Sequence, residues 1–152
     1  MAKKKKSAKK SVRSKKRAPK KKGAKRAAAT SLDALARKIV KMTQKPDFAP
    51  ADLSVLYAED CSSQEASGQI ALGLDGLEDK LKRWEQMQSG TKWTARNVWT
   101  GPKSICIEWD AAVKTRDGRT VNLREVAVHE IKDGKIQRER FYYNPMDLAP
   151  PT

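Results

Sequence analysis

The sequence has little of what metal sites, disulfide scaffolds and membrane spans are built from. Its 152 residues include one histidine, His129, and two cysteines, Cys61 and Cys106, without CxxC spacing. Zinc sites and disulfide frameworks need clusters of such residues, so we expect no metal, no cofactor and two reduced thiols. No apolar run approaches the ~18 residues of a membrane-spanning helix, which argues against membrane insertion. The cationic N-terminus is not followed by the apolar segment of a secretory signal.

Acidic residues are absent from the first thirty positions. Residues 1–30 hold 15 Lys/Arg and no Asp/Glu, whereas residues 31–152 hold 18 of each class. The whole formal charge of +15 therefore belongs to the first segment, and the remainder is neutral. Like charges and few apolar side chains predict that this segment is disordered by itself. We expect a basic tail over residues 1–30, a folded domain over 31–148 and a short C-terminal tail over 149–152.

The basic tail predicts non-specific binding to nucleic acid or another polyanion. Lysine contacts phosphate as a point charge, and the tail has no aromatic residues that would stack on bases. Its composition resembles the Lys/Ala-rich tails of linker-histone-like proteins. A nuclear localisation signal in "KKRAPKKKGAKR", an anionic membrane surface and a solubilising extension are the alternatives. The expected location is cytoplasmic, with nucleoid association in a bacterium, or nuclear in a eukaryote. The predicted nucleic-acid contacts are Lys3, Lys4, Lys5, Lys6, Lys9, Lys10, Arg13, Lys15, Lys16, Arg17, Lys20, Lys21, Lys22, Lys25 and Arg26.

Hydrophobic periodicity predicts helices first and strands afterwards. Helical spacing follows a cap at Thr30 or Ser31, recurs in "ADLSVLYA", and runs on from a capping box that begins at Asp75. Two weak strands fall near residues 60–66 and 69–72. After Gly90 the period becomes two, with strands over 91–100, 104–115, 120–132 and 135–143 and Asp-Gly hairpin turns between the last three. Helices on one side of an antiparallel sheet make an α+β fold.

The stretches "LSVLYAEDC", "GLEDKLKRW" and "VHEIKDGKIQRERFYYNP", in this order, resemble the nuclear transport factor 2-like superfamily in its SnoaL-like branch over residues 31–148. The resemblance implies a cone in which a curved sheet wraps around three helices, with a pocket at the open end. It also implies frequent homodimerisation through the outer sheet face. Members include isomerases, cyclases, epoxide hydrolases and non-catalytic domains, so the fold implies no reaction. Ala127 and Phe141 stand where catalytic relatives often place an acid, which lowers the expectation of catalysis.

The last hairpin decides which side chains reach the pocket. A regular two-residue turn at Asp133-Gly134 places His129 opposite Arg138, on a face that also carries Arg140. The other face carries an apolar set, and burying that set costs less than burying arginines. We therefore predict that the apolar set faces the pocket and that His129 faces outward. A single bulge would reverse this assignment.

Two groups of pocket residues follow from this reading. The predicted lining consists of Tyr57, Trp84, Trp99, Trp109, Val126, Val128, Phe141 and Tyr143, each of which has ordinary core packing as its alternative. The catalytic candidates are Glu139, Glu130 and Glu65, because a carboxyl group in an apolar cavity has a raised pKa and can act as a general base. The alternatives are a solvent-exposed rim position for Glu130 and a lysine or arginine partner for Glu139.

The leading prediction is a pocket domain that binds a small, largely hydrophobic ligand, or a dimeric interaction module, held at nucleic acid by the tail. The alternative is a small cofactor-independent isomerase, cyclase or hydrolase that uses a pocket carboxylate as its base. A third possibility is a stress or interaction scaffold with a redundant pocket.

Overall fold

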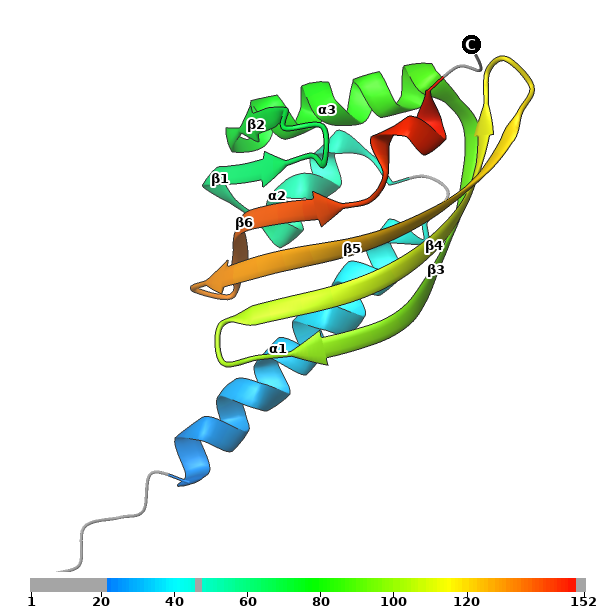
Figure 1. The fold of residues 1–152 in the computed structure, drawn as a ribbon. Coiled ribbons are helices and arrows are strands. Elements are labelled where there is room, and N and C mark those ends of the chain that lie inside the picture. Colours follow the sequence, from blue (N-terminus) through cyan, green and yellow to red (C-terminus); the bar gives the residue numbers. More distant parts are fainter. Residues whose placement is uncertain (1–21, 46–47, 150–152) are drawn as a thin grey trace, which may run out of the picture.

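The computed structural model describes residues 22–45 and 48–149, and their side chains from residue 32 onward. It confirms the α+β class, with helices packed against one six-stranded sheet (Figure 1). The elements in chain order are α1 (Lys22–Thr43), η1 (Pro50–Asp52), α2 (Leu53–Leu56), β1 (Tyr57–Gln64), β2 (Ile70–Leu72), α3 (Gly73–Met87), β3 (Gln88–Thr100), β4 (Ser104–Thr115), β5 (Thr120–Lys132), β6 (Lys135–Tyr142) and η2 (Pro145–Leu148). No helix within the described ranges is long and apolar enough to cross a membrane.

Several element ends differ from those expected. Helix α1 begins at Lys22 rather than at Thr30 or Ser31, so residues 22–30 of the tail predicted to be disordered are helical. Residues 1–21 of that tail lie outside the described residues. Helix α2 is a single turn, so Tyr57 belongs to β1. Helix α3 begins at Gly73, whose φ of 67° lies in the left-handed region that glycine adopts without a Cβ clash.

The sheet has the strand order β2-β1-β6-β5-β4-β3. Strands β3 to β6 form the predicted antiparallel meander, whereas β1 pairs with β6 in parallel, so the sheet is mixed rather than purely antiparallel. The parallel pair arises because the chain leaves β1 through β2, α3 and the whole meander before β6 returns in the same direction. In Figure 1 the long strands β3, β4 and β5 curl around α1, while α3 lies across the opposite end.

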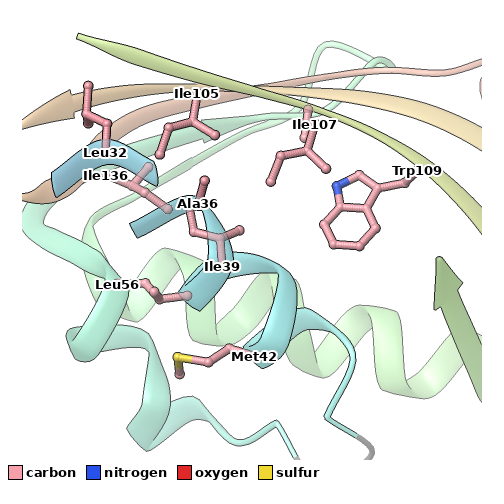
Figure 2. Close-up of a cluster of buried hydrophobic side chains, with 10 residues drawn as sticks. Leu32, Ala36, Ile39, Met42, Leu56, Ile105, Ile107, Trp109 and Ile136 are labelled. Carbon is pink, nitrogen blue, oxygen red and sulfur yellow. The ribbon is translucent and has the colours of Figure 1, made fainter. Parts of the chain in front are cut away.

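The core lies between the concave face of this sheet and α1. Side chains of β4 alternate as predicted, and Ile105, Ile107 and Trp109 are all at most 3 % exposed. They pack against Ala36 and Ile39 on α1, as Figure 2 shows. Full burial of one such aliphatic side chain contributes about 1.5–3 kcal/mol, so this contact fixes α1 on the sheet.

The last hairpin contains a bulge that the sequence does not predict. Its two-residue turn is as predicted, with Asp133 and Gly134 at positive φ and Ile131 paired with Ile136. The next pair is Glu130 with Arg138, so Gln137 is an extra residue on β6. Its side-chain Nε2 donates to the carbonyl oxygen of Asp60 at 3.1 Å and to its Oδ1 at 3.0 Å.

The bulge reverses the predicted face of β5. His129 now pairs with Glu139, and both side chains are buried, so the prediction that His129 faces outward beside Arg138 is wrong. Val126 and Val128 lie on the outer face instead of the pocket face. The expectation that arginines stay outside holds: on the outer face Arg140 lies 2.8 Å and Arg138 3.8 Å from Glu130. The predicted pairing requires an uninterrupted ladder, and the bulge at Gln137 interrupts it.

Candidate active site

A cavity of about 880 Å³ opens between the concave sheet face and helices α2 and α3. This volume is typical of pockets for small organic molecules. The predicted lining residues that reach it are Tyr57, Trp84, Trp109, Phe141 and Tyr143, and Trp93 joins them. Trp99 does not: it is 53 % exposed on the outer face. A bulge at Arg96 shifts the register of β3, so that Ala95 pairs with the inward Trp109 but Trp99 pairs with the outward Cys106.

Three tryptophans form one continuous part of the wall. The rings of Trp84 and Trp93 are 6.1 Å apart and tilted by 37°, and those of Trp93 and Trp109 are 5.8 Å apart in an edge-to-face arrangement. Such geometries are favourable for aromatic pairs and hold the rings in place. The wall therefore offers a preformed aromatic surface to a ligand.

Glu139 is the centre of a buried polar network. Its carboxylate accepts hydrogen bonds from Tyr57 Oη at 2.8 Å and from Ser63 Oγ at 2.6 Å. Lys80 Nζ lies 3.6 Å from the same carboxylate and 3.9 Å from the centre of the Phe141 ring. Burial by itself raises the pKa of Glu139, but Lys80, His129 and Ser63 together hold it well below its ordinary value. Glu139 is therefore a fixed anion with its oxygens already occupied.

The side chain of His129 is buried beside this anion. Its Nδ1 lies 3.3 Å from Glu139 Oε2, but the approach does not have hydrogen-bond geometry. Neither ring nitrogen has a hydrogen-bond partner within the described part of the chain. Buried polar atoms are rarely left without partners, so the two ring nitrogens are free to bond a molecule that enters the cavity.

Lys80 connects the Glu139 network to Glu65. Its Nζ lies 2.6 Å from Glu65 Oε1 and donates to Ser63 Oγ at 2.8 Å. Tyr143 Oη donates to the other oxygen of Glu65 at 2.8 Å, and burial together with Glu65 raises the pKa of Tyr143. Glu65 follows β1 rather than lying within it, yet it reaches the cavity as predicted.

Glu125 is a cavity residue that we did not predict. It lies on β5 opposite Trp109, is 7 % exposed, and makes no hydrogen bond or ion pair with any described residue. Burial raises its pKa to about 8, the charges of Glu65 and Glu139 add to the effect, and Lys80 offsets part of it. Near neutral pH both protonation states are populated, which suits a general acid or base.

The predicted catalytic carboxylates separate into two sets. Glu139 and Glu65 meet around Lys80 in the cavity, whereas Glu130 lies on the outer face with Arg138 and Arg140 and does not line the cavity. The bulge explains this placement, because it moves even-numbered residues of β5 outward. Within the described ranges, no group of three or more His, Cys, Asp or Glu side chains is arranged to hold a metal.

Solved structures share this architecture. A Mesorhizobium loti protein named as a SnoaL-like polyketide cyclase matches with a TM-score of 0.62 and 21 % identity, over 74 % of this chain and 98 % of that one. A protein of ketosteroid isomerase-like fold from Catenulispora acidiphila, in complex with trimethylamine, matches with a TM-score of 0.64 and 16 % identity, over 78 % and 88 %. TerC, co-crystallised with polyporic acid, matches with a TM-score of 0.63 and 16 % identity, over 78 % and 92 %.

Identities this low establish the fold alone. A search of curated protein sequences finds no significant match. The family model of the SnoaL-like domain, however, matches residues 36–139, which is more than half of the chain and includes most of the cavity wall. The chain therefore belongs to the SnoaL-like domain family, with the fold of nuclear transport factor 2.

Proposed function

We propose that this domain binds a small, largely hydrophobic molecule in the cavity and moves a proton on it without a cofactor, as isomerases and cyclases do. The observation that carries the proposal is Glu125, a buried carboxyl group that faces the cavity beside Trp109 and has no polar partner among the described residues. A carboxyl group with a pKa near the working pH is an efficient general acid or base.

The two inner carboxyl groups, Glu125 on β5 and Glu139 on β6, have different roles. Glu139 has its oxygens bonded to Tyr57 and Ser63 and a depressed pKa, so it is a poor proton acceptor at neutral pH. It instead fixes the positions of Lys80 and His129. Glu125 has no competing partner in the part of the chain that the structure describes, and it is the group that can exchange a proton with a ligand.

The wall supports a hydrophobic, flat ligand. Trp84, Trp93 and Trp109 supply a continuous aromatic surface, and Phe141 adds a fourth ring that is held against Lys80. Two solved proteins of this fold contain small molecules, polyporic acid in TerC and trimethylamine in the Catenulispora protein. These examples support small-molecule binding as the use of the cavity.

Carbon–hydrogen exchange tests the proposal without knowledge of the substrate. A panel of aryl ketones with acidic α-protons is incubated with the protein in D₂O, and deuterium uptake is followed by proton NMR. We expect exchange whose rate rises with pH through about 8 and is lost in Glu125→Gln. The matched control is Glu130→Gln on the outer face, which should exchange like the wild type. Ligand binding without Glu125-dependent exchange would show that the domain binds a small molecule but does not transfer a proton.

We also propose that the basic tail tethers the domain to nucleic acid. The support is compositional: the whole formal charge of +15 belongs to residues 1–30. Each lysine–phosphate contact releases a counterion, so tail binding should be strongly salt-dependent and independent of base sequence.

Homodimerisation through the outer sheet face is the third part of the proposal. That face exposes Trp99 and Tyr142, each 53 % exposed, on β3 and β6. Large aromatic side chains on a sheet surface are typical of protein interfaces.

A further inference from the structure

The interior of the cavity is short of positive charge. Three carboxyl groups, those of Glu65, Glu125 and Glu139, line its interior, and that of Glu85 lies at the exposed rim, while Lys80 is the one inner lysine or arginine among the described residues. The other cations of the wall lie at its solvent-exposed rim, where Arg116 is held by the carbonyl oxygen of Glu85. A molecule inside the cavity therefore meets an excess of carboxyl groups.

Lys80 cannot form ion pairs with all three carboxyl groups. Its Nζ contacts Glu65 at 2.6 Å, Ser63 at 2.8 Å and Glu139 at 3.6 Å, which uses its three donors on one side of the cavity. Glu125 is 7 % exposed and makes no hydrogen bond or ion pair with any described residue. A buried carboxylate without a counter-charge is costly, so this position must hold a proton or receive a cation from a ligand.

Aromatic rings lie where that cation would sit. Trp109 is the direct cross-strand neighbour of Glu125, and Trp93 packs edge-on against Trp109 at 5.8 Å. Aromatic faces attract ammonium groups, most strongly where water is excluded. Carboxylate and indole together are the combination that recognises alkylated ammonium groups, and they disfavour anions.

We propose that the cavity selects an organic cation, a hydrophobic amine or quaternary ammonium compound, whose positive group lies between Glu125 and the rings of Trp93 and Trp109. The inference rests on the proposed function, since it names the class of molecule on which Glu125 acts. The apolar part of such a ligand lies along the Trp84 side of the wall.

Binding of the cation is coupled to loss of a proton. Before binding, Glu125 carries a proton over much of the neutral range; the incoming cation replaces this proton, which leaves to solvent, so charge is conserved. The other titratable groups that face Glu125 are Glu65, Lys80 and Glu139, with His129 on its own strand and the phenols of Tyr57 and Tyr143. The bound cation thereby leaves Glu125 as a carboxylate that pairs with it.

The experiment compares a cation with its neutral isostere on the full chain. Benzyltrimethylammonium and neopentylbenzene have nearly the same shape and differ in charge. Isothermal titration calorimetry at pH 6 and pH 9 should show that the cation binds about tenfold or more tightly at pH 9, whereas the isostere does not change. Titrations in buffers of different ionisation enthalpy at pH 7 should report release of close to one proton per cation bound, a measurement that needs no variant.

Two variants locate the effect. Glu125→Gln should weaken cation binding at pH 9 about tenfold or more and abolish the pH dependence, with neopentylbenzene affinity unchanged within about twofold. Glu130→Gln should bind both probes like the wild type. Binding of the isostere as tightly as the cation at pH 9, absence of proton release, or unchanged cation binding in Glu125→Gln would each overturn the inference.

The outcome also separates this inference from the proposed function. Glu125-dependent exchange on neutral ketones, together with failure to prefer the cation, would overturn the ligand class and leave proton transfer standing. Cation binding through Glu125 without exchange on any probe would leave the ligand class standing and overturn the enzymatic function.

Discussion

His129 and Glu139 face each other across β5 and β6, with Nδ1 of the imidazole 3.3 Å from Oε2 of the carboxylate and both side chains buried. The pair exists because Gln137 is left out of the ladder. Both side chains are buried only in this strand register. The stability of the fold and the chemistry of the cavity therefore depend on the same two residues.

Removal of the Glu139 charge should destabilise the fold. Glu139→Gln takes away the anion that Tyr57, Ser63 and Lys80 surround, and we expect a loss of about 2–4 kcal/mol in the free energy of unfolding, measured in urea at pH 7. The control Glu130→Gln, whose partners are exposed arginines, should lose less than about 1 kcal/mol. Equal effects of the two substitutions would show that the network does not stabilise the fold.

Glu125 should make the protein less stable in alkali. Its pKa in the folded state is raised to about 8 from an ordinary value of 4.5, so its contribution to stability is present below about pH 4.5 and is lost as pH rises through 8. Glu125→Gln should therefore exceed the wild type in free energy of unfolding at pH 9, by on the order of a few kcal/mol, and should melt at a similar temperature near pH 5. Thermal melts across this range check the prediction, and parallel pH profiles for the two proteins would contradict it.

Deletion of Gln137 should leave the strand faces as they are. Without the extra residue, the pairs Ile131–Ile136, Glu130–Arg138 and His129–Glu139 follow one another in a regular ladder, so Glu139 stays inward and Arg138 stays outward. The deletion removes the two hydrogen bonds to Asp60, and we expect a loss of about 1 kcal/mol in the free energy of unfolding, close to that of Gln137→Ala. Urea titration of the two variants checks this, and failure of the deletion variant to fold would show that the bulge itself is required.

The tail should account for any binding to nucleic acid. A chain lacking residues 1–21 keeps α1 whole and loses most of the tail cations. For about seven phosphate contacts, the full chain should show a slope of log K against log salt near −6, at ~0.9 per contact, and no preference among DNA sequences. Fluorescence anisotropy with a labelled duplex at several salt concentrations measures this slope. Equal affinity of the shortened chain would exclude the tail as the binding element.

The outer sheet face should carry the dimer contact. Trp99→Lys places a charge at an exposed aromatic position without touching the cavity, so it should convert a dimer into a monomer in analytical ultracentrifugation and leave ligand binding intact. The control Val55→Lys changes an exposed apolar residue on α2 and should leave the dimer unaltered. A wild-type chain that sediments as a monomer at high concentration would exclude the interface.

Much of the fold could be predicted because strong local signals coincide. The alternation of Ile105, Ile107 and Trp109 fixes the inner face of β4, and Asp133-Gly134 fixes the turn of the last hairpin. The site was harder to predict, because two bulges at non-glycine residues, Arg96 and Gln137, reverse the faces beyond them. Neither residue type marks a bulge in a sequence.

The same reversal explains which site residues were found and which were missed. Glu139, Phe141 and Tyr143 were placed correctly on the inner face of β6 and its continuation. Their partners on β5 were placed on the wrong face, and Glu125 was therefore overlooked. Only tertiary pairing with β1, through Gln137 and Asp60, reveals where β6 shifts.

The tryptophans lie in two different environments, so their fluorescence reports on two parts of the molecule separately. Trp84, Trp93 and Trp109 line the cavity, where Trp109 is enclosed by the core shown in Figure 2, while Trp99 stands alone on the outer face. Emission from a buried indole is blue-shifted relative to that from an indole in water. Ligand occupancy should therefore change the short-wavelength part of the spectrum, and self-association the long-wavelength part, so that a single unlabelled sample reports on both events.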